Sequence, residues 1–221
     1  MDAISAPFAG RVRAGSPVRS VERTPLGVAV AWDGGHETFD EVVMAVHSDT
    51  ALGMLADPSA AEREVLGAIP YQPNEVVLHT DTSLMPRRRR AWASWNFHLP
   101  AEGEAHGEEE RTTVTYDMNI LQRLEADREF LVTLNRTDAI DPERIIRTMS
   151  YSHPVYTDGT VRAQARWEHV SGRNRTHYCG AYWGWGFHED GVRSALRVSR
   201  RIASTSRPIV IEPRPVEALA A

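Results

Sequence analysis

The stretch that decides the fold is Thr176-His177-Tyr178-Cys179-Gly180-Ala181-Tyr182, which runs into Trp183-Gly184-Trp185-Gly186-Phe187-His188-Glu189-Asp190-Gly191. Its first half predicts a strand, its glycines predict a tight crossing, and the residues after Phe187 predict a helix. The free N–H groups and the positive dipole end of that helix would face an electron-rich ligand atom beside the strand end. The alternative is an ordinary strand–loop–helix crossover whose glycines only form turns.

This segment resembles the C-terminal flavin-binding motif of the flavin-containing amine oxidoreductases, and more narrowly a bacterial branch described as predicted NAD/FAD-binding proteins. The terminal motif is fairly specific to that branch. Weaker similarities follow in the family's order along the chain, at residues 39–49, 71–74, 92–96, 115–119 and 152–156. The resemblance therefore extends over nearly the whole chain.

The resemblance implies an α/β fold, in which an incomplete FAD/NAD(P)-binding Rossmann-like domain carries an inserted β-rich (α+β) substrate domain. Family members begin with a strand and the fingerprint G-x-G-x-x-G, which holds the FAD pyrophosphate at a helix N-terminus. That pattern does not occur in this sequence. We therefore expect the C-terminal portion of a longer flavoprotein, from a truncated gene model, a split gene or a decayed gene. Such a portion should also expose an unpaired sheet edge.

On the family's arrangement, four parts of the chain are expected. They are residues 1–70, part of the FAD-binding domain; 71–167, the substrate domain; 168–205, the C-terminal FAD-binding strand and helix; and 206–221, a tail.

The resemblance also implies which residues hold FAD. The first turn of the last helix would place its amides at the pyrimidine edge of the flavin ring, through His188, Glu189, Asp190, Gly191 and Val192. Glu189 and Asp190 are expected to cap the helix or to bond ribityl hydroxyls rather than to act as acids. Gly180 and Ala181 would let the strand end approach the ribityl–phosphate portion.

Val18 and Val21 fit the family's V-x-x-V pattern, whose backbone meets the adenine. A plain hairpin is the alternative for these two valines. Aromatic walls around the flavin are expected from Trp95, Tyr151, Tyr182, Trp183 and Trp185, and hydrophobic core is the alternative for each. No catalytic residue can be assigned.

All 25 basic residues are arginine, so lysine chemistry is excluded. Many amine-oxidising relatives use a lysine near the flavin, and we therefore favour a hydrophobic organic substrate over an amine. A net charge of −5 argues against a nucleic-acid partner, and the run Arg87–Arg90 is interpreted as a solvated loop. The single cysteine, Cys179, excludes an internal disulfide.

No metal site is expected, because the adjacent residues His188, Glu189 and Asp190 seldom converge on one ion. His47, His79, His153 and His177 are interpreted as structural. The sequence has no signal peptide and no membrane-spanning run, so a cytoplasmic location is expected.

Periodicity predicts a meander of strands at 18–23, 27–32 and 36–39, then a buried parallel strand at 41–46. Helices are expected at 48–55 and 59–68, the second with a capping box from Ser59 and Glu62. The middle region should form strands at 76–79, 90–95, 112–116 and 130–134, a short helix at 118–124, an exposed loop at 101–110, and a helix or turn at 142–147.

The function that these features favour is part of an FAD-dependent oxidoreductase that accepts hydride from an organic, hydrophobic substrate, and that is inactive alone. One alternative is a non-catalytic subunit that completes a flavin site with a separate N-terminal polypeptide. Another is a cofactor-free module that binds small apolar ligands.

Overall fold

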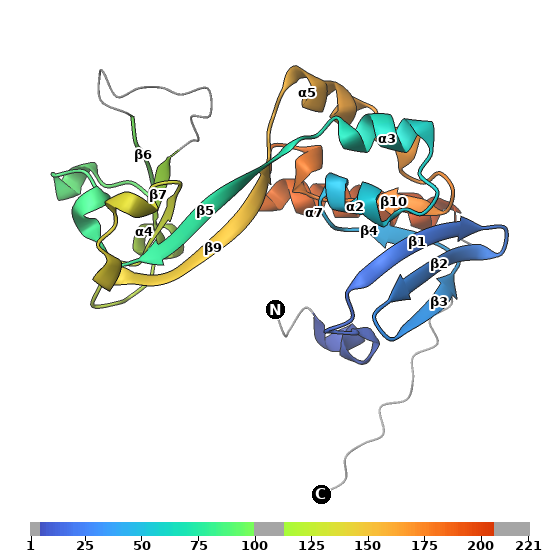
Figure 1. Ribbon diagram of the computed structural model, residues 1–221, viewed down its shortest axis with the longest axis horizontal. Helices are drawn as coiled ribbons and strands as arrows, with labels where there is room; N and C mark the ends of the chain where they lie inside the picture. Colours follow the sequence, from blue (N-terminus) through green and yellow to red (C-terminus); the bar gives the residue numbers. More distant parts are fainter. Residues whose placement is uncertain (1–4, 100–112, 206–221) are drawn as a thin grey trace, which may run out of the picture. The chain divides into compact units, whose positions relative to one another are not determined.

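The computed structural model describes residues 5–99 and 113–205 (Figure 1). The chain divides into a first unit, Met1–Pro70 with Pro154–Ala221, and a second unit, Tyr71–His153. The expected loop at 101–110 and the expected tail at 206–221 lie outside the described residues. The second unit ends at His153 and not at residue 167, because the helix that follows, α5 (Asp158–Ala165), packs on α3 (Ala60–Gly67) of the first unit.

The first unit opens with a short 3₁₀ turn, η1 (Ala6–Arg11), and an antiparallel meander. Its strands are β1 (Val18–Thr24), β2 (Gly27–Trp32) and β3 (Gly35–Phe39), in that spatial order. A Cβ at Gly27 would lie 2.4 Å from the carbonyl oxygen of Phe39, so only glycine lets β2 begin this close to β3. The meander predicted from the sequence is confirmed.

A parallel pair of strands lies at the centre of this unit. β4 (Val42–Met44) pairs with β10 (Thr176–Tyr178), and Val43 is opposite His177. The apolar run therefore does form a parallel strand, as predicted. Its expected burial is only partly correct: Met44 is buried, but Val43 keeps 43% of its surface exposed. Successive side chains point to opposite sides of a strand, and the described residues leave the side of Val43 uncovered.

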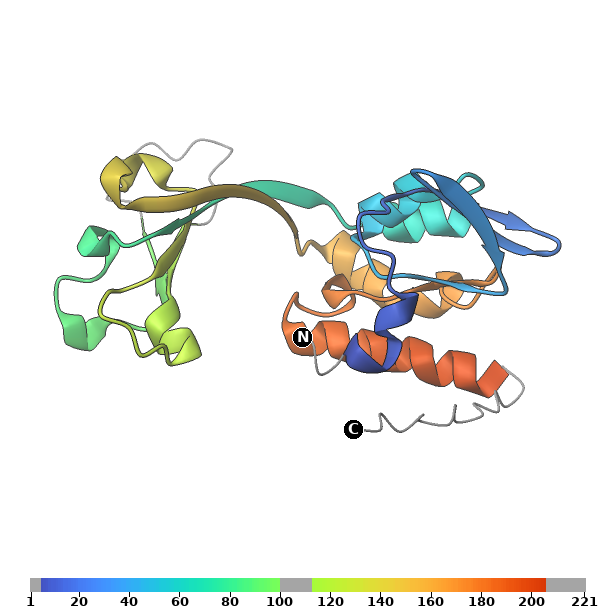
Figure 2. The same ribbon diagram turned by 90° about the horizontal axis from the view of Figure 1, so that it is seen from below.

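Helices lie on both sides of the parallel pair (Figure 2). α2 (Ser48–Met54) and α3 lie on one side, and the long helix α7 (His188–Thr205) lies on the other. Tyr178 accordingly reaches Glu62 of α3, whereas its neighbour Cys179 packs with Val198 of α7. The predicted capping box of α3, between Ser59 and Glu62, is present. The short helix α6 (Trp167–Val170) and the 3₁₀ turn η6 (Ala181–Trp183) complete this unit.

The outer edge of β10 is closed by the chain itself. The N–H and C=O groups of Thr176, Tyr178 and Gly180, which lie on the edge away from β4, are all hydrogen-bonded at 2.8–3.3 Å. Their partners are Arg173 O, the Gly172 amide, Ser171 Oγ, Trp167 Nε1, Ser194 Oγ and the Trp183 amide. The edge of β10 is therefore satisfied by side-chain and backbone groups of α6, α7 and the intervening loops. The unpaired edge expected from the sequence is at β4, which within the described residues pairs with β10 alone.

The second unit is a five-stranded sheet in the order β6-β7-β8-β5-β9. Its strands are β5 (Tyr71–His79), β6 (Trp95–Phe97), β7 (Val114–Asp117), β8 (Leu131–Leu134) and β9 (Ile145–Pro154). The connections hold α4 (Met118–Gln122) and the 3₁₀ turns η2 (Thr82–Leu84), η3 (Arg89–Ala91), η4 (Thr137–Ala139) and η5 (Pro142–Arg144). The predictions of strands near 76–79, 112–116 and 130–134 and of a helix near 118 are confirmed.

Two predictions in the second unit were wrong. Residues 90–95 were expected to form a strand, but the chain turns there and β6 begins only at Trp95. Local bonds stabilise the turn, because Trp92 donates to the Pro86 carbonyl and the Asn96 side chain bonds both the Ala93 amide and its carbonyl. The expectation at 142–147 included a turn but missed β9, whose burial does not alternate with period two.

Candidate functional site

The decisive stretch forms a strand end, a compact crossing and a helix start. β10 ends at Tyr178, η6 follows, and α7 begins at His188. The crossing turns at Gly186, whose φ of +87° suits glycine and strains other residues. The predicted strand at 176–182 is thus shorter than expected, because residues 181–183 coil into η6.

Asp190 holds the crossing against the helix. Its Oδ2 accepts hydrogen bonds from the amides of Trp185 and Phe187, at 3.0 and 3.1 Å. A Cβ at Gly184 would lie 2.4 Å from the Asp190 carboxylate, so the glycine makes room for this contact. The capping role expected of Asp190 is confirmed. Glu189 instead accepts from Arg193 one turn later, at 3.2 Å, on the exposed surface.

Two amides at the positive end of α7 have no acceptor in the part of the chain that the structure describes. The amides of Asp190 and Gly191 both donate to the carbonyl of Phe187. The amides of His188 and Glu189 find no acceptor within residues 5–99 and 113–205. An α-helix of 18 residues therefore begins with two unsatisfied donors at the end of its dipole that attracts negative charge.

Ser194 ties the strand end to this helix start. Its Oγ accepts from the Gly180 amide and donates to the Gly191 carbonyl, both at 2.8 Å. Gly180 and Gly191 thus lie close together, and Ala181 approaches the Cβ position of Gly191 to 3.9 Å. A Cβ at Gly180 would lie 2.4 Å from the ring of Tyr182, so the space beside this glycine is occupied by the chain's own ring. Ser194 was not singled out from the sequence, because a serine in a helix gives no periodic or motif signal.

Of the two valines proposed for the adenine end, Val21 is buried and Val18 is half-buried on β1. The carbonyl of Val21 accepts from the Ala56 amide at 2.9 Å. The backbone of Val21 is therefore partly engaged within the chain.

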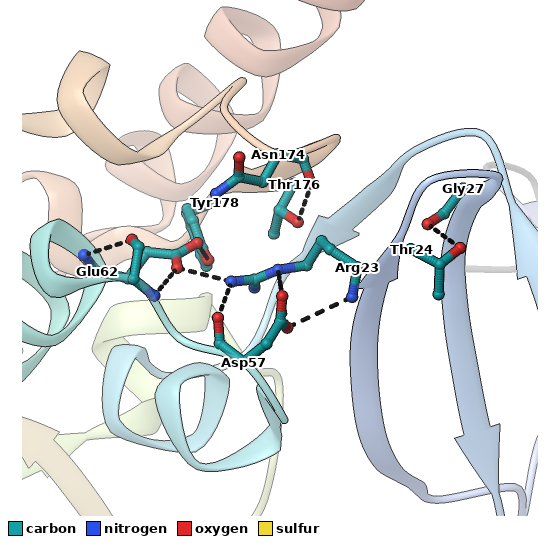
Figure 3. A network of polar contacts seen from close by, with 9 residues as sticks. Arg23, Thr24, Gly27, Asp57, Glu62, Asn174, Thr176 and Tyr178 are labelled. Atoms are coloured by element: carbon teal, nitrogen blue, oxygen red, sulfur yellow. Dashed lines mark hydrogen bonds and ion pairs between the residues drawn. The ribbon is translucent and has the colours of Figure 1, made fainter.

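A buried charged network joins β1, α3 and β10 (Figure 3). Arg23 donates to Glu62 and to both the carboxylate and the carbonyl of Asp57, and the Tyr178 hydroxyl donates to Glu62 at 2.6 Å. Burial opposes the charge of Glu62, but hydrogen bonds from Tyr178 and Ser59, with the charge of Arg23, outweigh it and lower the pKa of Glu62. Burial and the neighbouring Glu62 raise the pKa of Tyr178. The network stabilises the first unit, and none of the residues named in it belongs to the crossing at Gly186.

The five aromatic candidates lie in both units, and Tyr182 of the first unit is buried, as its core alternative predicted. In the second unit, Trp95 is 52% exposed and meets Tyr116 edge-to-face at 5.6 Å, and Tyr151 is also exposed. In the first unit, Trp183 packs on the cluster of Trp167, Cys179 and Val198, and Trp185 is exposed with its ring 5.5 Å from that of Tyr156. The core alternative thus applies in part to Trp183, and Trp95 is not a core residue.

The second unit buries a chain of neutral polar groups that the sequence did not reveal. The Asp81 amide donates to His79 Nδ1, which leaves the proton of this imidazole on Nε2. His79 Nε2 lies 2.7 Å from Thr133 Oγ1, which lies 2.8 Å from Thr115 Oγ1. Thr115 Oγ1 is in turn 2.8 Å from His98 Nε2. The structural role predicted for His79 is confirmed, and its partners come from strands that no local pattern connects to it.

Other chemistry is limited. Cys179 is buried, and burial raises the pKa of its thiol. Within residues 5–99 and 113–205, no three His, Cys, Asp or Glu side chains are grouped so as to hold a metal ion. No helix in the same part of the chain is long and apolar enough to cross a bilayer.

A family model described as flavin containing amine oxidoreductase matches residues 2–126, more than half of the chain. The chain belongs to this family. The match covers the meander and much of the second unit, whereas the glycine-rich crossing at 176–191 lies beyond it.

Solved structures of similar fold include a putrescine oxidase with redesigned cofactor binding, with a TM-score of 0.60 and 17% identity over 93% of this chain and 53% of that one. A CLA-producing fatty acid isomerase from P. acnes gives 0.54 and 15%, over 86% and 47%. Cyclohexylamine oxidase from Brevibacterium oxydans IH-35A gives 0.53 and 11%, over 85% and 48%. At these identities the likeness concerns the fold, and the chain spans about half the length of these structures. A search of curated proteins found no match.

Family membership makes FAD the implied cofactor. The residues present fit part of it. The unsatisfied amides of His188 and Glu189 suit an electron-rich ring edge, and at Gly191 a Cβ would meet nothing closer than 3.9 Å, so the backbone is accessible there. The fingerprint for the pyrophosphate is absent from the sequence.

Proposed function

We propose that this chain is part of an FAD-dependent oxidoreductase, and that the first turn of α7 holds the pyrimidine edge of the flavin ring. The observation that carries this proposal is the pair of unsatisfied amides, His188 and Glu189, at the start of a long helix. When bound, the flavin supplies hydride acceptance. The helix start would stabilise the negative charge that gathers on that edge when the ring is reduced.

Around this turn we assign the remaining contacts as the family resemblance implies. The first unit is then part of a Rossmann-like cofactor domain. Gly180, Ala181, Asp190, Gly191 and Val192 would line the ribityl side and the ring edge, and Val18 and Val21 the adenine end. Since Asp190 already binds two amides of the crossing, its role is to position the helix start.

The pyrophosphate would be held by a polypeptide that carries the glycine fingerprint, and the isolated chain would be inactive. This part of the proposal rests on the absence of the fingerprint from this sequence. The closed edge of β10 restricts how such a polypeptide could join. Adding a strand there would require displacing Trp167 Nε1 and Ser171 Oγ from Tyr178.

We propose that the substrate is a small, apolar organic molecule, and that the second unit helps to bind it. Trp95, Tyr116 and Tyr151 offer aromatic surface for such a molecule. The sequence contains no lysine that could act in amine oxidation. Trp183 and Trp185 remain proposed walls on the first unit.

The test replaces one amide. His188 is the first residue of α7, a position where proline is well tolerated because its missing N–H has no helical acceptor. His188→Pro removes one unsatisfied donor, and His188→Ala removes only the imidazole. The chain, alone and with a polypeptide carrying the fingerprint, is titrated with FAD and followed by visible absorption. We expect flavin binding that His188→Pro weakens and His188→Ala leaves unchanged. Absence of flavin binding in both mixtures, or equal effects of the two variants, would contradict the proposal.

A further inference from the structure

The arginine run of the second unit, Arg87–Arg90, takes no part in the proposed function. It leads into η3, and all four of its side chains are exposed. Arg89 forms an ion pair with Glu129 and lies 4.6 Å from the centre of the Trp92 ring. The other three arginines have no carboxylate partner in the described part of the chain. An exposed turn thus carries three positive charges without an ion pair among these residues.

A small apolar surface lies at the same end of the second unit (Figure 2). The amide of Met118, the first residue of α4, donates to the Phe130 carbonyl at 2.9 Å. Since Phe130 follows Glu129, the ion pair of Arg89 holds the arginine turn close to α4. The apolar residues there, Ile120, Leu121 and Leu124, keep 47%, 44% and 39% of their surface exposed. We call residues 87–90 and 120–124 together the basic–apolar patch.

The exposed apolar side chains do not hold α4 in place. No residue of this helix is buried, and polar contacts fix it instead. The Asp117 carboxylate accepts from the Ile120 amide at 3.0 Å. The Asn119 side chain bonds the Arg128 carbonyl and the Phe130 amide, both at 2.9 Å. Packing within the described residues therefore does not account for isoleucine and leucine at these positions, and contiguous exposed apolar side chains are a feature of interaction surfaces.

The charges beside the apolar side chains indicate the kind of partner. Arg123 lies among these side chains on the chain and is also exposed. The exposed carboxylates that follow, Glu125 and Asp127, are matched in number by Arg123 and Arg128. The run 87–90 therefore leaves this end of the second unit positive, although the whole chain has a net charge of −5.

A membrane surface with anionic lipids matches both features of the patch. Arginine side chains reach lipid phosphates, while apolar side chains enter the boundary between headgroups and acyl chains. A second copy of this chain fits less well, because a two-fold contact would bring the same positive charges together. A nucleic acid would attract the arginines but would leave the apolar side chains of α4 uncovered.

We propose that the basic–apolar patch docks the chain on a membrane surface that contains anionic lipids. Its arginines contact lipid phosphates, and Ile120, Leu121 and Leu124 enter the boundary with the acyl chains. The net charge of the whole chain is repelled by an anionic surface, so the attraction comes from this local cluster. The proposal concerns the second unit alone and holds whether or not the flavin assignment is correct.

The experiment mixes the full chain with vesicles of phosphatidylcholine alone, and with vesicles of equal parts phosphatidylcholine and phosphatidylglycerol. Flotation then separates vesicle-bound protein from free protein. We expect binding to the vesicles that contain phosphatidylglycerol and little binding to phosphatidylcholine alone. Binding should weaken as the salt concentration rises, because salt screens the charges of the arginines. Absence of binding to both kinds of vesicle, or equal binding to both, would overturn the proposal.

Loss of one arginine tests the electrostatic part of the proposal. Arg88→Gln should weaken vesicle binding about fivefold, which corresponds to about 1 kcal/mol for one basic residue at an anionic surface. Arg200→Gln is the matched control, because Arg200 is an exposed arginine of α7 in the first unit. Equal weakening by the two variants would mean diffuse attraction to the whole chain and would overturn the proposal.

Loss of one apolar side chain tests the insertion. Leu121→Gln should weaken vesicle binding about tenfold, because glutamine does not enter the apolar boundary. Leu196→Gln is its control, since Leu196 is 48% exposed on α7, close to the 44% of Leu121. All four positions are exposed, so the variants should keep the fold, which circular dichroism checks. A Leu121→Gln chain that binds these vesicles as tightly as the Leu196→Gln chain would overturn the proposal.

Discussion

The two units differ in the main polar network that each buries. The first unit buries charges, since the side chains of Arg23 and Glu62 are 6% and 1% exposed and the Tyr178 hydroxyl bonds to the carboxylate. The second unit buries a neutral chain from His79 through Thr133 and Thr115 to His98. The second unit also buries the carboxylates of Asp81 and Asp117, but backbone amides donate to these. The first unit instead buries both partners of an ion pair.

This difference predicts which change in charge or protonation destabilises each unit. A buried ion pair costs desolvation, and removing one partner leaves the other charge uncompensated. A neutral chain avoids that cost, but its direction is fixed, because His79 Nδ1 already accepts from the Asp81 amide. Adding a proton to the acceptor nitrogen of His98 therefore breaks the chain. The first unit should be sensitive to loss of a charge, and the second to gain of a proton.

The largest effect should come from breaking the charged network. Glu62→Ala leaves Arg23 buried beside Asp57 alone and also removes the acceptor of Tyr178. We expect the free energy of unfolding to fall by about 3 kcal/mol, measured by urea denaturation. Glu64→Ala on the same helix is the control. Glu64 is 63% exposed and pairs with Arg166, and such surface pairs contribute about 1 kcal/mol or less. Equal losses of unfolding free energy in Glu62→Ala and Glu64→Ala would contradict the view that the first unit depends on its buried ion pair.

A smaller loss should follow from interrupting the neutral chain. Thr133→Val keeps the shape of the side chain but leaves His79 Nε2 without its partner and removes one of the two partners of the Thr115 hydroxyl. We expect a loss of about 2 kcal/mol, the typical result of leaving buried polar groups unsatisfied. Thr148→Val, on the exposed surface of β9, should change the same denaturation curve by about 0.5 kcal/mol or less. A Thr133→Val protein as stable as the parent would show that the chain does not stabilise the sheet.

The stability of the two units should respond differently to a fall in pH. Burial lowers the pKa of His79, and burial with the charge of Arg136 lowers the pKa of His98. Below about pH 6.5, where an ordinary histidine titrates, the unfolded chain binds more protons than the folded one, so the second unit loses stability as the pH falls. The pKa of Glu62 is lowered, so its contribution persists until the pH falls below about 4.5, its ordinary range.

Hydrogen exchange measured by segment tests this difference. Between about pH 6.5 and 4.5, protection should fall in β5 and β8 before it falls in β4 and β10. His98→Gln keeps a hydrogen-bond acceptor but cannot titrate in this range, so it should reduce the pH dependence of the second unit. Simultaneous loss of protection in both units, unchanged by His98→Gln, would contradict the assignment.

Elements of this fold could be predicted where the residues that determine them are close together in the sequence. The meander, the capping box of Ser59 and Glu62, and the strand–crossing–helix of residues 176–191 all follow from neighbours within a few residues. The strand at 90–95 failed because the Asn96 side chain and the Trp92 indole stabilise a turn that propensity does not encode. β9 failed because its exposed residues show no alternation.

The candidate site divides in the same way. The sequence predicted the glycine-rich crossing, a capping aspartate and the start of α7, and Asp190 does cap the helix as expected. The contact of Ser194 with Gly180 and the closing of β10 by Trp167 and Ser171 required coordinates. These residues meet across turns and helices, and nothing in their spacing distinguishes them from other polar or aromatic side chains.

The sequence by itself determined the family, the apolar strands and the start of α7, because these depend on residue type and short-range periodicity. Only the tertiary structure decided which polar groups are satisfied: the network of Arg23 and Glu62, the unpartnered indole of Trp183, and the two amides that remain at His188 and Glu189. Hydrogen-bond satisfaction depends on which distant segments meet, and the chain order does not specify that.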